Sequence, residues 1–263
     1  MNTQEKLPSV FKLISDSWSD FFSHFKYVVL SLPAILAALI IFLLQNISQL
    51  SQGLWFFIFI VLFLVLYIYG IATLLYGTIH ASASIQESYT QAFTKFFPLV
   101  WVTFLATFLV FFGYIILLVP ALIFGVWYAF SQYVLFEENI GGTLALMKSK
   151  EYVKGKWWAT FGRILVFGIL LGIVIGVSGF LSKISQSLTI SILISILVNA
   201  LVLPFSFIFT YKLFRALKKI KGGDVQFTVT TGRKARYIVG AILGIFAPII
   251  FTFVLLAILG LGQ

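Results

Sequence analysis

Two adjacent carboxylates, Glu137 and Glu138, are the residues of this sequence best placed to do chemistry. They follow the stretch Pro98–Phe136, in which no residue is charged. As a functional pair they would bind a cation or a polar lipid headgroup. As a structural pair they would hold Lys148, Lys150 or the N-terminus of a nearby helix. We favour the structural interpretation and keep both residues as a candidate headgroup site.

A second polar feature lies within a long apolar run. Ser195, Asn199 and Ser206 are four and seven residues apart, so they share one face of a helix. They would either line a polar seam or, more commonly, form hydrogen bonds between helices. Asn199 is therefore the second candidate polar site.

The sequence offers little else for catalysis. It has no cysteine, and its two histidines, His24 and His80, are isolated. No Ser-His-Asp set, phosphate loop or metal-binding cluster is present, so we expect no enzyme activity, no cofactor and no metal. The apolar runs carry no Asp, Glu, Lys or His between their ends, which argues against an ion-coupled transporter. Sites lined by backbone groups remain open.

Composition places the chain in a membrane. Hydrophobic residues make up 61% of the sequence and charged residues 10%, whereas soluble domains carry about 25% charged residues. The apolar residues lie in runs of about 20, the length that a helix needs to cross a bilayer. We therefore predict an all-α, polytopic transmembrane bundle over residues 1–263. The net charge of +10 indicates basic loops beside anionic lipid rather than nucleic-acid binding.

Seven spans and three interfacial helices are predicted to position these residues. An amphipathic helix at Pro8–Lys26 lies in the membrane interface, and Gln91–Phe97 and Leu144–Lys154 are expected to resemble it. The predicted spans are 27–45, 54–78, 98–118, 120–136, 157–181, 188–211 and 237–261. The uncharged stretch 98–136 must fold back, because its 39 residues would form a helix of about 58 Å. Pro120 opens the second half of this hairpin, since proline suits the first turn of a helix.

The basic residues orient the chain. With the N-terminus in the cytoplasm, every Lys and Arg except Lys183 falls on or near the cytoplasmic side. The C-terminus is then predicted outside. We expect a multi-pass protein of the cell membrane, with its interfacial helices on the cytoplasmic face and anionic lipid headgroups as partners.

The fifth predicted span carries glycines at Gly168, Gly172 and Gly176. Small residues at every fourth position let another helix approach closely. The approaching helix would belong to this chain, to a second copy or to another protein.

The sequence also contains a weak internal repeat. Aligning Ser17, Ser88 and Ser149 places His24, Lys95 and Lys156 together, followed in each case by an aromatic residue. Either three units each consist of an interfacial helix and a hairpin, or all cytoplasmic junctions share basic and aromatic residues. The sequence does not separate these alternatives.

The stretch 119–163 carries a loose pattern of prolines, aromatics and small residues. Its members are Pro120, Trp127-Tyr128, Glu137, Ala145-Leu146, Ser149, Gly155 and Trp157-Trp158. This pattern resembles a family of polytopic membrane proteins that includes the membrane domain fused to some glycerophosphoryl diester phosphodiesterases. Members often have a cation in the fourth span, where this chain has Gly125-Val126-Trp127. The chain has no room for a phosphodiesterase barrel, so the resemblance implies a membrane module of undefined role.

Two functions from different classes follow. The first is a non-enzymatic scaffold or accessory subunit in the cytoplasmic membrane. The alternative is a transporter or lipid-handling protein whose substrate passes near Asn199. A membrane-embedded enzyme would need a cluster of polar side chains at one depth, which the sequence does not indicate.

Overall fold

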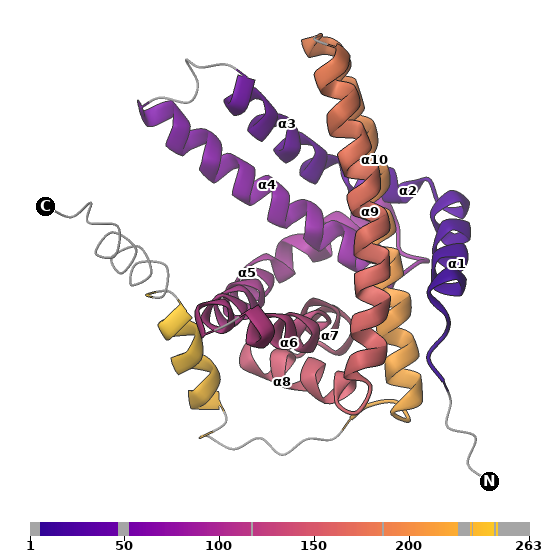
Figure 1. The fold of residues 1–263 in the computed structure, drawn as a ribbon, viewed down its shortest axis with the longest axis vertical. Coiled ribbons are helices and arrows are strands. Elements are labelled where there is room, and N and C mark those ends of the chain that lie inside the picture. Colours follow the sequence, from indigo (N-terminus) through magenta and orange to yellow (C-terminus); the bar gives the residue numbers. More distant parts are fainter. Residues whose placement is uncertain are drawn as a thin grey trace, which may run out of the picture. The chain divides into compact units, whose positions relative to one another are not determined.

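Ten helices and the turns between them account for residues 6–46, 53–116, 118–185 and 187–225; the computed structural model also describes residues 232, 234–244 and 246, which are helical. No strand occurs in these ranges. The helices are α1 (Val10–Ser23), α2 (Lys26–Leu30), α3 (Leu32–Asn46), α4 (Gly53–Ile79), α5 (Ile85–Ile116), α6 (Leu118–Tyr128), α7 (Ser131–Glu138), α8 (Gly142–Val153), α9 (Trp157–Ser185) and α10 (Leu188–Ile220) (Figure 1).

The chain forms two compact units. The α1–α4 unit comprises residues 5–96 and 162–216, and the α6–α8 unit comprises residues 97–161 and 217 onward. Three long helices, α5, α9 and α10, therefore begin in one unit and end in the other.

Five described helical segments are long and apolar enough to cross a membrane. They are Trp55–Ile79, Ile85–Tyr114, Leu118–Glu138, Trp157–Ser185 and Leu188–Ile220. These segments support the predicted class of multi-pass helical membrane protein, but they do not confirm seven spans. The predicted span 237–261 lies largely outside the described residues.

The predicted first span, 27–45, is not one continuous helix. It breaks at Ser31 into α2 and α3, and the apolar helix described there, Leu32–Ile41, is shorter than the spans named above. Pro33 explains the break, because its ring nitrogen cannot donate to the carbonyl of Val29. The hydroxyl of Tyr89 donates to that carbonyl instead, at 2.8 Å.

The α1–α4 unit is held together by polar contacts around α1 and by close packing of α3 on α4. Figure 1 shows α3 and α4 as a hairpin. Lys212 of α10 pairs with Asp20 of α1 at 2.7 Å. Arg163 of α9 donates from Nε to the carbonyl of Pro8 at 2.7 Å, so it anchors the chain just before α1.

The interfacial helix predicted at Gln91–Phe97 is not separate from the next span. Residues 85–116 form one continuous helix, α5, with Pro98 in its interior. Proline removes only one backbone donor, which can be tolerated where the surroundings satisfy the released carbonyl. The predicted boundary between the segment Gln91–Phe97 and the span 98–118 is therefore not a helix boundary.

The predicted fold-back within 98–136 is confirmed. Helix α5 ends at Ile116, and Pro120 lies in the first turn of α6. The two helices approach closely at Gly113, where an added Cβ would stand 2.9 Å from the backbone nitrogen of Ala121. A side chain there would force the two helices apart, so this close approach requires glycine at position 113.

The glycines of α9 have no such neighbour. At Gly168, Gly172 and Gly176, no atom of another described element lies within 4 Å of where a Cβ would stand. The three glycines are exposed. One interpretation of the glycine pattern was that another helix of this same chain packs against it. No such helix is found among the described residues.

Candidate functional site

The predicted carboxylate pair lies in a network of buried charges in the α6–α8 unit. Glu137 and Glu138 end helix α7, where the helix dipole disfavours negative charge. Two lysines offset that cost. Lys148 of α8 lies 2.6 Å from Glu138, and Lys218 of α10 lies 3.0 Å from Glu137 and 2.8 Å from Glu138.

A glycine turn brings a third carboxylate to the same lysines. Helix α10 ends with hydrogen bonds from the Gly222 N–H to the Lys219 carbonyl and from the Gly223 N–H to the Lys218 carbonyl, both at 3.0 Å. This pattern is a Schellman motif, and Gly222 supplies the left-handed conformation that it needs, with φ at +79°. The turn places Asp224 3.1 Å from Lys218.

One phenol completes the network. The hydroxyl of Tyr152 donates to Glu138 at 2.6 Å. Burial raises the pKa of Tyr152, and the hydrogen bond to Glu138 adds to this effect, so the phenol remains a donor at neutral pH. The Lys218 ammonium lowers the pKa of Asp224, so this carboxyl remains charged.

The network matches the structural interpretation of Glu137 and Glu138, in which the pair holds Lys148. Three of its members were missed by sequence analysis: Tyr152, Lys218 and Asp224. Lys218 and Asp224 lie some eighty residues away along the chain, and no spacing connects them to the glutamates. Tyr152 could have been found, because it lies one helical turn after Lys148.

Lys150, the other candidate partner of the glutamates, faces a separate cavity. This cavity has a volume of about 560 Å³, within the range of small-molecule sites. Its lining comes from α5, α6, α8 and the described segment after α10: Leu109, Phe112, Phe124, Trp127, Tyr128, Met147, Lys150, Glu151, Lys154, Arg236, Tyr237 and Gly240. All of these residues belong to the α6–α8 unit.

Helix α8 gives one face to the cavity and another to the charge network. Met147, Lys150 and Glu151 share one face of α8 and line the cavity together with Lys154, the residue that follows the helix. Lys148 and Tyr152 share another face and contact Glu138. The spacing of the four cavity residues was a sequence signal that could have indicated this site.

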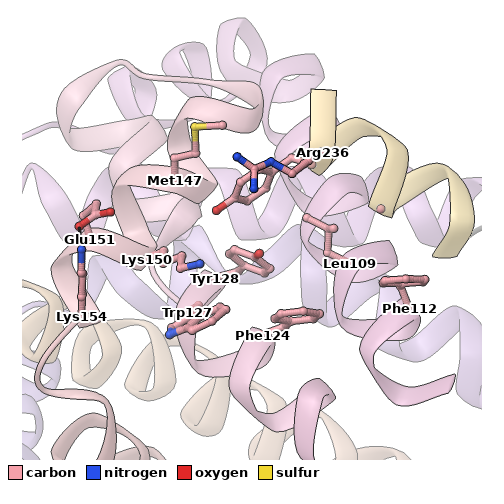
Figure 2. A pocket seen from close by; sticks show the side chains of 12 residues that line it. Leu109, Phe112, Phe124, Trp127, Tyr128, Met147, Lys150, Glu151, Lys154 and Arg236 are labelled. Atoms are coloured by element: carbon pink, nitrogen blue, oxygen red, sulfur yellow. Dashed lines mark ion pairs between the residues drawn. The ribbon is translucent and has the colours of Figure 1, made fainter. Parts of the chain in front are cut away.

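The charged side chains of the α8 region and the apolar side chains of α5 lie at different ends of the cavity, whereas the charged Arg236 comes from the segment after α10. Figure 2 shows Glu151 and Lys154 at one end and Leu109 and Phe112 at the other. The Lys154 ammonium and a Glu151 carboxylate oxygen are 3.5 Å apart. Between these ends, Lys150 places its ammonium 3.8 Å from the centre of the Trp127 ring. A cation in this position is attracted by the π-face of the indole.

The aromatic residues of the cavity pack on one another. The rings of Phe124 and Trp127 have centres 5.6 Å apart, and those of Tyr128 and Tyr237 are 5.9 Å apart. The second contact joins α6 to the segment that carries Arg236. The cavity therefore has an aromatic wall with cations near it, which suits a ligand with an apolar part and an anionic part.

Asn199, the other predicted polar site, lies in the α1–α4 unit and does not line this cavity. Its side-chain amide donates to the carbonyl of Ser195 at 2.8 Å. Ser206 likewise donates to the carbonyl of Val202, at 2.6 Å. These two bonds stay within α10, so they do not join two helices.

Among the residues that the structure describes, no group of three or more His, Cys, Asp or Glu side chains could hold a metal ion. No family model, curated protein or solved structure matches the chain. The resemblance to the phosphodiesterase-associated membrane domain stays a prediction.

Proposed function

We propose that this protein is a non-enzymatic, lipid-handling protein of the cell membrane that binds a membrane amphiphile in the cavity of the α6–α8 unit. The observation that carries the proposal is the composition of the cavity lining, which changes from charged at α8 to apolar at α5. A phospholipid has the same division between its headgroup and its acyl chains. This proposal keeps the lipid-handling alternative of the sequence analysis but places the lipid in the cavity instead of near Asn199.

The orientation expected from the basic residues agrees with this proposal. Lys150, Lys154 and Arg236 all belong to segments expected on the cytoplasmic side. A lipid of the inner leaflet would reach the cavity with its headgroup at α8 and its acyl chains toward Leu109 and Phe112. Amphiphile binding needs neither a catalytic residue nor a cofactor.

Native mass spectrometry of the detergent-purified protein tests the proposal. We expect a discrete phospholipid adduct that survives detergent exchange, and Phe112→Gln should reduce its occupancy by placing an amide at the apolar end of the cavity. Phe111→Gln is the matched control, because Phe111 is 44% exposed and does not line the cavity. The absence of any retained lipid, or equal loss in the two variants, would refute the proposal.

A second function, that of an accessory subunit, is supported by the exposed glycines of α9. Gly168, Gly172 and Gly176 would accept a close helix from a second copy or from another protein. Co-purification of a stoichiometric protein, lost in Gly172→Leu, would favour this function. The two functions are compatible, because α9 does not contribute to the cavity lining.

A further inference from the structure

The cavity lining carries more positive than negative charge. Its cations are Lys150, Lys154 and Arg236, and its one carboxylate is Glu151, which leaves a surplus of two positive charges (three minus one). Glu151 pairs with Lys154. The lining therefore carries a net positive charge, to which Lys150 and Arg236 contribute alongside the Lys154–Glu151 pair.

Lys150 is held in a position that favours an anion over a choline headgroup. Its ammonium covers the face of Trp127, which is the surface that would otherwise attract a quaternary ammonium. A second cation at that face would be repelled by Lys150. The Ser149 hydroxyl donates to the backbone carbonyl of Trp127 at 2.6 Å, so it holds the backbone that carries this indole.

Arg236 supplies the geometry that suits phosphate. A guanidinium is planar and offers paired N–H donors that match two phosphate oxygens, whereas an ammonium acts as a point charge. The Arg236 Nε donates to the Gly232 carbonyl at 3.3 Å. The terminal nitrogens lie beyond this bond, at the end of the side chain that lines the cavity (Figure 2).

We propose that the cavity selects a phospholipid of net negative charge by binding its phosphate between Lys150 and Arg236. This inference rests on the proposed lipid-handling function and adds the headgroup class. Trp127 acts as a positioning residue, since it holds the Lys150 ammonium at the border between the charged and the aromatic lining.

Lipid competition tests the proposal. The purified protein is placed in nanodiscs of phosphatidylcholine that contain phosphatidylglycerol, phosphatidylethanolamine or neither, all with the same acyl chains. Native mass spectrometry then measures which lipid the protein keeps after release into detergent. We expect phosphatidylglycerol to be enriched about 25-fold over either zwitterionic lipid, because two cations, each contributing about fivefold, act near the headgroup.

Matched variants assign that selectivity to the cavity. Lys150→Gln and Arg236→Gln should each lower the enrichment of phosphatidylglycerol about fivefold, while Lys150→Arg should preserve most of it. Lys219→Gln is the control, because it removes the same charge from an exposed lysine of the same unit that does not line the cavity. Trp127→Leu should reduce the enrichment without removing a charge.

The outcomes separate this inference from the proposed function. Retention of no lipid would overturn both. Equal retention of all three lipids would leave the proposed function standing and overturn the charge selectivity, as would an equal loss in Lys219→Gln and Lys150→Gln. Competition by glycerol 3-phosphate as strong as that by the intact lipid would overturn the lipid as the source of the phosphate.

Discussion

The ammonium of Lys148 lies 2.6 Å from a carboxylate oxygen of Glu138, and the two side chains are 7% and 6% exposed. Charges this deeply buried are tolerated only as pairs, because each loses its hydration. Lys218 and Tyr152 also contact Glu138. Glu138 is therefore the carboxylate on which α7, α8 and the end of α10 converge.

Glu138→Gln should lower the free energy of unfolding by about 3–5 kcal/mol, the usual cost of breaking a buried ion pair from one side. Reversible unfolding in mixed micelles, followed by tryptophan fluorescence, measures the change. Asp16→Asn is the matched control, because Asp16 is an exposed acid of α1. Lys148→Met should cost less in the Glu138→Gln background than alone, since the two groups are coupled. Equal effects of Glu138→Gln and Asp16→Asn would contradict this role.

Asp224 gives the network a dependence on pH. The pKa of Asp224 is lowered in the folded protein, chiefly by its hydrogen bond to Lys218. A lowered folded pKa contributes stability above the unfolded value of about 3.9, and this stability is lost as the pH falls through the folded value. Because Asp224 is exposed, the contribution is at most about 1 kcal/mol.

Asp224→Asn should therefore be slightly less stable than the native protein at pH 7, and the difference should disappear well below pH 4. Thermal unfolding at a series of pH values measures this convergence. A difference between the two proteins that stays constant down to pH 3 would show that Asp224 acts through something other than its charge.

Substitution of glycine by alanine is expected to have opposite effects on stability at two kinds of position. An added Cβ at Gly70 would stand 2.5 Å from the backbone nitrogen of Ala34, whereas nothing lies within 4 Å at Gly172. Gly70→Ala should cost about 1–3 kcal/mol through overpacking, because backbone cannot move aside as a flexible side chain can. Gly172→Ala should be neutral or slightly stabilising, since alanine favours helix. Unfolding of the two variants in parallel checks both values.

The sequence was sufficient to predict the membrane class and the long helices, because apolar runs of spanning length have few alternatives. It could not predict the break at Ser31. Pro33 was visible, but whether a helix bends or breaks depends on partners for the released carbonyls. Tyr89 donates to the released Val29 carbonyl and Thr73 donates to the neighbouring Leu30 carbonyl, and both donors lie more than forty residues away.

The candidate site was predictable only in part, for a similar reason. Glu137 and Glu138 were recognisable because charge is rare in this chain, and Lys148 was near enough in sequence to be proposed as their partner. Lys218 lies in a run of basic residues, so its composition resembles that of any cytoplasmic loop. The cavity depends on how α5, α6 and α8 pack together, which the pattern of a single helix does not determine.

Ser149 bridges the break between α6 and α7. Its hydroxyl donates to the Trp127 carbonyl at 2.6 Å and accepts a hydrogen bond from the Phe130 N–H at 3.2 Å. The other two serines of the internal repeat, Ser17 and Ser88, are equally buried. Their hydroxyls donate four residues back along the chain, to the carbonyls of Leu13 and Ser84.

The three serines thus occupy equivalent positions in the repeat but make different hydrogen bonds. Ser149→Ala should cost about 1–3 kcal/mol, because it removes two bonds to buried backbone at a helix break. Ser17→Ala should cost less, since its bond is to a carbonyl that the helix already uses and alanine is the better helix former. Equilibrium unfolding of Ser17→Ala, Ser88→Ala and Ser149→Ala gives the comparison. Three equal costs would indicate that the serines are needed for packing volume alone, and would favour three equivalent units over a bridge at Ser149.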